Sequence, residues 1–171
     1  VQLMLGTIED TDEGEETTPT FGASDIMHLS RVQLLAAYAC TECGRCTDEC
    51  PANQTGKLLS PRKIMMDTRR RSQEVAENIR HNKGTFVPDQ KALLGDYITP
   101  EELWACTTCA ACVEACPMEI SPLSIIVEMR RYIVMEQSAA PASLNKMMTQ
   151  MENTSSPWGY NPAERETVLN E

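Results

Sequence analysis

Two cysteine-rich segments of the sequence share one spacing. Residues 40–51 are Cys-Thr-Glu-Cys-Gly-Arg-Cys-Thr-Asp-Glu-Cys-Pro, and residues 106–117 are Cys-Thr-Thr-Cys-Ala-Ala-Cys-Val-Glu-Ala-Cys-Pro. These two segments contain all 8 cysteines of the chain. The run C-x2-C-x2-C-x3-C-P is typical of proteins that hold two cubic iron–sulfur clusters through cysteine thiolates. The sequence therefore predicts two [4Fe–4S] clusters.

The same run predicts which cysteines share a cluster. Its fourth cysteine binds the other cluster, and the proline that follows turns the chain away from its own loop. We therefore predict two crossed ligand sets. We assign no catalytic residue. One set is Cys40, Cys43, Cys46 and Cys116, and the other is Cys106, Cys109, Cys112 and Cys50.

Two other uses of cysteine fit the spacing less well. Zinc sites usually take thiolates from two separated C-x2-C pairs, without a third cysteine and a trailing Cys-Pro. A disulfide framework needs an oxidising compartment, but the visible N-terminus lacks a basic start followed by an apolar run. We therefore expect a reducing cytoplasm, or the cytoplasmic face of a membrane reached through a partner or a missing segment.

Charge and hydropathy exclude some partners. The formal net charge is −10 over 171 residues, and clusters with their thiolates make the protein more negative still. This balance argues against nucleic acid as a partner. No stretch approaches the roughly 18 apolar residues of a membrane span, so we predict no transmembrane segment in this chain.

Composition divides the chain into three parts. Residues 9–20 contain no aliphatic or aromatic residue and cannot bury surface to offset the entropy of ordering. We predict an acidic flexible linker over residues 1–24 and a cluster-binding domain over residues 25–140. For residues 141–171 we predict a helix through the methionines that follow Pro141, then an irregular tail suited to contact a partner chain.

Four helix starts are predicted from capping patterns. Each has a serine or threonine at the cap, and three of the four have proline at the first helical position. The caps are Ser30, Ser60, Thr99 and Ser121. Apolar or small residues follow at helical spacing. They are Val32, Leu35, Ala36 and Ala39 in the first helix, Ile64, Met65, Thr68 and Val75 in the second, and Ile125, Ile126, Met129 and Ile133 in the last.

The two halves of the sequence resemble one another beyond their cysteines. An aromatic residue and alanine precede each loop, and a Ser-Pro and an Arg-Arg pair follow it. The matching pairs are Tyr38-Ala39 with Trp104-Ala105, Ser60-Pro61 with Ser121-Pro122, and Arg69-Arg70 with Arg130-Arg131. Strand signals are scarce. We therefore predict an all-α fold with two pseudo-symmetric helix–cluster loop–helix units.

These motifs resemble those of the α-helical dicluster ferredoxins. The similarity is strongest to the iron–sulfur C-subunit of heterodisulfide reductase and to the iron–sulfur subunit of glycolate oxidase and related Fe–S oxidoreductases. It is carried by residues 40–51, by Ser-Pro-Arg-Lys-Ile at 60–64 and by Glu-Glu-Leu-Trp-Ala-Cys-Thr-Thr-Cys at 101–109. The resemblance implies electron transfer through two [4Fe–4S] clusters, as a subunit or module of a larger oxidoreductase linked to flavin, quinone or disulfide.

The resemblance also implies partners. They are a flavoprotein or a redox subunit with Cys-Cys-Gly repeats, or a membrane cytochrome or quinone system. No cysteine follows Cys116, so the disulfide chemistry of the longer relatives is not expected here, and the chain is not expected to be catalytic on its own. The alternative function is a structural or oxygen-sensing and redox-sensing iron–sulfur protein without a relay role.

Some residues near the loops leave two interpretations open. Residues 57–83 are rich in Lys and Arg and form either a docking face for an acidic partner or an ordinary solvated helix face. Gly44 and the pair Ala110-Ala111 are small, which lets backbone N–H groups approach the sulfurs or serves loop packing alone. His28 and His81 receive no role.

Overall fold

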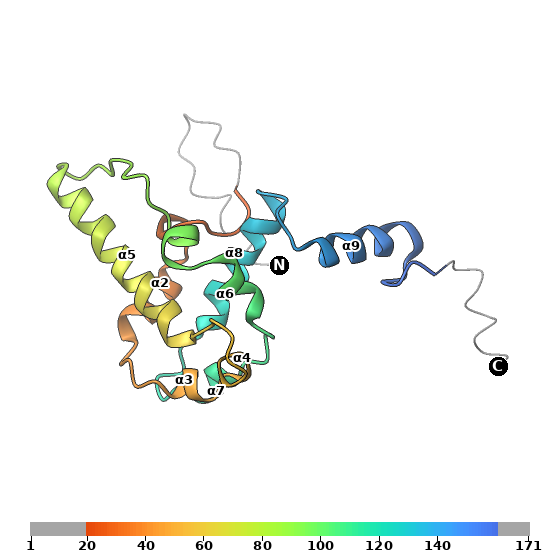
Figure 1. Ribbon diagram of the computed structural model, residues 1–171. Helices are drawn as coiled ribbons and strands as arrows, with labels where there is room; N and C mark the ends of the chain where they lie inside the picture. The colour runs from red at the N-terminus through yellow and green to blue at the C-terminus, as the bar shows by residue number, and fades with distance from the viewer. Residues whose placement is uncertain (1–19, 161–171) are drawn as a thin grey trace.

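The computed structural model describes residues 20–160 (Figure 1). Its elements are η1 (Ile26–His28), α2 (Arg31–Ala39), α3 (Arg45–Asp48), α4 (Pro51–Gln54), α5 (Pro61–His81), η2 (Leu93–Tyr97), α6 (Pro100–Ala105), α7 (Ala111–Glu114), α8 (Pro122–Met135) and α9 (Ala142–Thr154). Within this part of the chain, the one extended pairing is an isolated bridge between Leu94 and Ile98. The predicted all-α class is confirmed.

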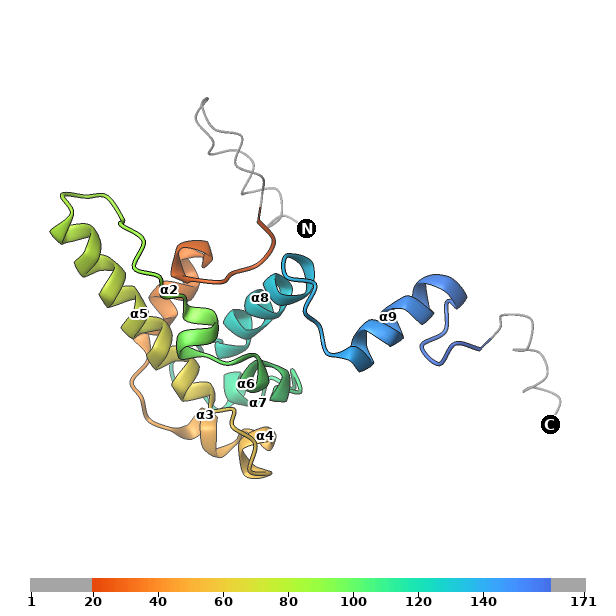
Figure 2. The same ribbon diagram turned by 45° about the horizontal axis from the view of Figure 1, so that its top comes forward.

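The helices form two similar units. In the first, α2 leads into the first cysteine loop, α3 and α4 follow, and α5 packs against α2. In the second, α6 leads into the other loop, α7 follows, and α8 packs against α6. The units are joined where α5 packs on α8 and α3 packs on α7, as Figure 2 shows from a second direction. The predicted pair of helix–loop–helix units is confirmed.

The predicted caps start the helices where the sequence placed them. The side chains of Ser30 and Thr99 accept from the third backbone N–H of α2 and α6, and each helix returns a glutamine or glutamate to complete a capping box. The side chains of Ser60 and Ser121 cap α5 and α8 in front of a proline. Local hydrogen bonding therefore determines four helix starts.

The spaced residues of α5 and α8 are buried, whereas Val32 and Leu35 of α2 are not. Val32 and Leu35 are 76% and 68% exposed, whereas Ala37 is 1% exposed. The small Ala37 side chain lets α2 approach α5 closely, with Leu34 partly buried beside it. The helix therefore turns its bulkier apolar side outward.

Arg71 lies in the core, not on a docking surface. Its side chain is 0% exposed and reaches Asp25 at 2.8 Å and Asp89 at 2.5 Å. It also donates to the carbonyl oxygen of Lys91 at 2.7 Å. This pairing lowers the pKa of Asp89 to about 2. The cluster ties η1 and the segment before η2 to the middle of α5, so including Arg71 in a basic docking face was wrong.

The packed part of the chain extends N-terminal to the boundary predicted at residue 25. Ala23 is 1% exposed and its N–H donates to the carbonyl oxygen of Glu128 on α8 at 3.1 Å. A Cβ on Gly22 would lie 2.4 Å from that oxygen, so only glycine fits at this crossing. Residues 1–19, which hold most of the predicted linker, lie outside the described residues, as do residues 161–171.

Helix α9 occupies the region where a C-terminal helix was predicted through Met151. It has no buried residue, and Figure 1 shows it extending away from the other helices. Its three methionines, Met147, Met148 and Met151, are exposed. The cluster-binding units are therefore built without it.

Candidate iron–sulfur site

The two cysteine loops have the same construction. Cys40 caps the C-terminus of α2, and Cys106 caps the C-terminus of α6. The third cysteines, Cys46 and Cys112, lie within the short helices α3 and α7. Each loop thus runs between two helix ends that fix its first and third cysteines.

Both loops also carry left-handed residues at matching positions. Glu42 and Thr108 have φ of 58° and 56°, each two residues after the first cysteine. Gly44 and Ala110 have φ of 88° and 61° and cap α3 and α7. Alternation between left-handed and right-handed residues turns backbone N–H groups toward one side of a loop and forms an anion-binding concavity. The positive φ gives Gly44 a conformational reason.

Backbone donors reach the sulfurs inside the second loop. The N–H of Thr108 donates to Cys106 Sγ at 3.4 Å. The pKa of Cys109 is lowered, chiefly by the N–H of Ala111 and next by the Thr107 hydroxyl. Hydrogen bonds to sulfur stabilise thiolate and are among the features that set cluster potentials. The loop is therefore arranged to hold negative sulfur.

Cysteines from both segments meet in one pocket beside α3. Its lining includes Cys40, Cys43, Cys46 and Cys116. Cys116 reaches it from the second segment. Cys112 also lines it, because α7 packs directly on α3. The described residues thus place the fourth cysteine of the second segment with the first three of the other.

The remaining cysteines surround Cys112. Its pKa is raised to about 11, first by burial and then by the negative charge of neighbouring thiolates, among them Cys106, Cys50 and Cys109. Cys50 is 6% exposed and comes from the first segment. Burial is also the largest cause of the raised pKa values of Cys40 and Cys46. Burial, nearly complete at Cys112 and partial at Cys40 and Cys46, disfavours the thiolate form, and bound iron supplies the positive charge that favours it.

The spacing of the sulfurs is compatible with cluster ligation. Within residues 20–160, no three His, Cys, Asp or Glu side chains are placed to hold one metal ion. A cubic cluster spreads its ligands over separate iron atoms and therefore does not require such close convergence. The donor set and its spacing fit two iron–sulfur clusters.

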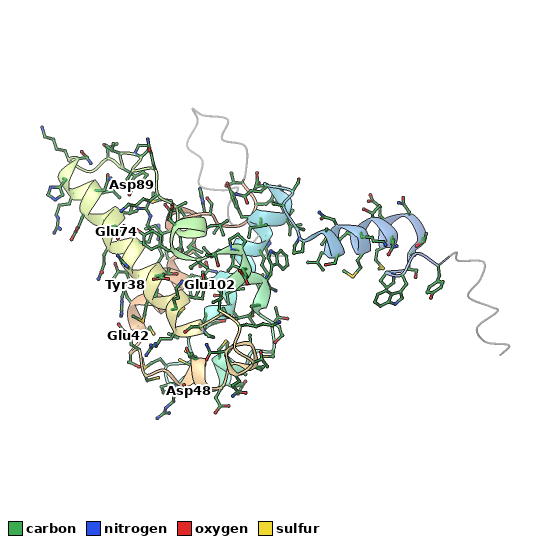
Figure 3. The ribbon with its side chains drawn as sticks, viewed as in Figure 1. Tyr38, Glu42, Asp48, Glu74, Asp89 and Glu102 are labelled. Atoms are coloured by element: carbon green, nitrogen blue, oxygen red, sulfur yellow. The ribbon has the colours of Figure 1, made fainter. Side chains whose placement is uncertain are left out.

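Two basic residues of the predicted docking segment pair with acidic side chains close to the cysteine loops or to α6. Arg69 pairs with Glu42, and Lys63 reaches Glu102 at 2.8 Å on α6 and Asp67 at 3.1 Å on its own helix. Figure 3 shows Glu42 near the first cysteine loop and Glu102 near the middle of the molecule. With Arg71 buried, the exposed arginines of α5 are Arg62, Arg70 and Arg80, and the segment does not present one continuous basic face.

The structure also identifies two arginines that the sequence did not assign to the loops. Arg69 donates to the carbonyl oxygen of Cys40 at 3.2 Å, and Arg130 donates to that of Cys106 at 2.5 Å. The guanidinium of Arg130 also lies 4.9 Å from the centre of the Trp104 ring. The sequence showed these arginines as matched Arg-Arg pairs in the repeat. It did not show that one arginine of each pair binds the carbonyl oxygen of a cysteine.

Comparison with known proteins identifies the class. Residues 39–120 match the family model of the 4Fe-4S dicluster domain, which encloses both cysteine segments. This part of the chain is a 4Fe-4S dicluster domain, and the predicted cofactors are confirmed as two [4Fe–4S] clusters.

Relatives among curated proteins are iron–sulfur oxidoreductases. The chain is 35% identical to the probable iron-sulfur-binding oxidoreductase FadF of Bacillus subtilis, over 97% of this chain and 28% of that protein. It is 33% identical to the EtfAB:quinone oxidoreductase of Syntrophomonas wolfei, over 91% of this chain and 24% of that protein. It therefore spans about a quarter of the length of either.

A third relative confirms the resemblance found in the sequence. The C-subunit of a ferredoxin/F(420)H(2)-dependent CoB-CoM heterodisulfide reductase from Methanosarcina acetivorans is 32% identical, over 70% of this chain and 60% of that relative.

Within the described residues, no helix has the length and apolar character needed to cross a membrane.

Proposed function

We propose that this chain is an electron-transfer module of a larger oxidoreductase and that electrons pass between its two [4Fe–4S] clusters. The observation that supports this most is the contact between the two cysteine groups. Cys112 of the second loop lines the pocket formed by Cys40, Cys43 and Cys46, because α3 packs on α7. Two clusters held by these loops lie side by side, which is the arrangement that a relay requires.

We further propose the crossed ligand sets. Cys116 completes the set of Cys40, Cys43 and Cys46, and Cys50 completes the set of Cys106, Cys109 and Cys112. The first set is supported by the shared pocket. For the second, Cys50 lies close enough to Cys112 to raise its pKa, as do Cys106, Cys46 and Cys109. All eight cysteines then act as cluster ligands, and neither unit can hold its cluster without the other.

The proposed partners are a flavin-bearing or Cys-Cys-Gly-bearing protein on one side and a quinone or membrane cytochrome system on the other. One relative is named as a quinone oxidoreductase and another as part of a heterodisulfide reductase. We propose that the chain works in the reducing cytoplasm, where its cysteines stay available for iron. The second cysteine of each segment, Cys43 or Cys109, is exposed. Each cluster therefore has one ligand at the protein surface, where a partner can approach it.

Repeated redox cycling tests this function against a purely structural or sensing role. Anaerobic protein is reduced with dithionite, freed of excess reductant and mixed with a water-soluble quinone in a stopped-flow spectrometer. We expect complete reoxidation in each cycle and unchanged iron and sulfide after several cycles, because a relay changes electron count without changing ligands. A chain that takes up no electrons, or loses its iron within one or two cycles, contradicts the relay.

A further inference from the structure

Two arginines occupy equivalent places behind the two loops. Arg69 on α5 and Arg130 on α8 each lie nine residues after the serine that caps their helix. Arg69 Nη1 donates to the carbonyl oxygen of Cys40, and Arg130 Nη2 donates to that of Cys106. Cys40 and Cys106 are the first cysteines of their loops. The repeat therefore places a guanidinium on the same backbone atom in both halves.

These hydrogen bonds occur where helices end. The last carbonyl groups of a helix lack partners within that helix and are commonly bound by other donors. Arg130 Nε also donates to the carbonyl oxygen of Leu103 at 3.0 Å, which accepts from the Cys106 N–H as well. Because a guanidinium is a rigid fork of donors, it fixes the backbone from which the first cysteine projects.

The guanidinium also brings a fixed charge. Arginine stays protonated in proteins, and reduction of a cluster adds one electron with no bond made or broken. A nearby positive charge therefore stabilises the reduced, more negative cluster, and the interaction is strengthened where water is partly excluded. Both side chains are only partly exposed.

We propose that Arg69 and Arg130 are positioning residues that also raise the reduction potential, each acting on the cluster bound by its own loop. The inference rests on the proposed function only in that each loop binds a separate cluster that can be reduced. It is independent of the partner that supplies the electrons and of how the fourth cysteines are assigned.

The two arginines are not equally free to act. Arg69 shares its charge with Glu42, and the two side chains are 22% and 41% exposed. Arg130 packs over the Trp104 ring, and in residues 20–160 no carboxylate lies within ion-pair distance of it. The pKa of Arg130 is lowered, chiefly by burial, and the neighbouring Cys106 partly opposes this shift. Glu42 therefore offsets the effect of Arg69, whereas nothing comparable offsets Arg130.

The test is an anaerobic potentiometric titration followed by electron paramagnetic resonance, with iron and sulfide measured on each sample. We expect Arg130→Gln to shift the reduction equilibrium of one cluster about tenfold toward the oxidised state, which is 59 mV for one electron. Arg69→Gln should shift the other cluster in the same direction by about threefold. Glu42→Gln should shift that same cluster toward the reduced state, and Arg130→Lys should retain most of the original potential.

Matched controls lie one residue further along each helix. Arg70→Gln and Arg131→Gln remove the same charge, and we expect both potentials to stay within error. The inference is overturned if Arg69→Gln and Arg130→Gln shift the same cluster, if either control shifts a potential as much, or if Glu42→Gln leaves both unchanged. Glu42→Gln leaves the hydrogen bond from Arg69 to the Cys40 carbonyl oxygen in place, so an unchanged potential in that variant overturns the inference even if the arginine variants lose iron. Reversible reduction of the unmodified protein separates this outcome from failure of the relay itself.

Discussion

Replacing Cys116 with alanine is expected to damage the cluster held by Cys40, Cys43 and Cys46, whose loop lies far upstream in the sequence. The reason is that Cys116 shares a pocket with these three sulfurs. Iron should fall from about eight atoms per chain toward about four, or toward about seven if a three-iron form persists, because a cubic cluster needs four thiolates. Elemental analysis and electron paramagnetic resonance of anaerobic samples measure this.

Three further variants identify which cluster is affected. If ligation is crossed, Cys116→Ala and Cys43→Ala retain the same intact cluster and give the same residual spectrum. Cys50→Ala and Cys109→Ala then share the other residual spectrum. If each segment instead holds its own cluster, Cys116→Ala resembles Cys109→Ala and Cys50→Ala resembles Cys43→Ala. The pairing of four spectra therefore decides the connectivity without depending on the fate of any single variant.

Replacing Arg71 with methionine should give the largest loss of stability outside the cysteines. The fully buried guanidinium is paired with Asp25 and Asp89, and its removal leaves two carboxylates without a cation. Breaking a buried ion pair from one side typically costs about 3 to 5 kcal/mol. Anaerobic urea unfolding of the iron-replete protein, followed by circular dichroism, measures the loss.

The neighbouring Arg70 supplies the control, because its side chain is 70% exposed and pairs with Glu74 at 3.5 Å. Arg70→Met should change the unfolding free energy by less than about 1 kcal/mol, as exposed ion pairs contribute little. A loss below about 1 kcal/mol for Arg71→Met would contradict the buried role.

Acid should remove part of the same contribution. Arg71 lowers the pKa of Asp89 from 3.8 to about 2. A lowered carboxyl pKa stabilises the folded chain above the unfolded pKa, and that stabilisation is lost as the pH falls from 3.8 toward 2. At neutral pH the ion pair of Asp89 with Arg71 therefore makes its full contribution to stability.

The features that the sequence predicted are those determined locally. Ser60 and Ser121 cap their helices through hydrogen bonds to residues three positions away, so the pattern is complete in a short segment. The cysteine spacing likewise specifies the type of cluster, because three of the four ligands of each cluster lie within seven residues of one another. Because the helix caps and the cysteine spacing both occur twice, they predicted a fold of two similar units.

The features that sequence analysis missed depend on contacts between distant segments. Arg71 lies at a position that helical periodicity from Thr68 and Val75 makes buried, but its charge suggested a surface residue. Its partners lie 46 and 18 residues away and could not be paired from the sequence. On α2, the small Ala37 side chain sets the packed side, whereas Val32 and Leu35 suggested the opposite one.

The central claim is that two adjacent clusters in this chain carry electrons, and reductive coulometry of the anaerobic protein tests it most directly. The chain should take up about two electrons, one for each [4Fe–4S] cluster, and return both on reoxidation. Iron and sulfide should each remain at about eight per chain throughout. Zinc in place of iron, or uptake of no electrons by iron-replete protein, would contradict the account.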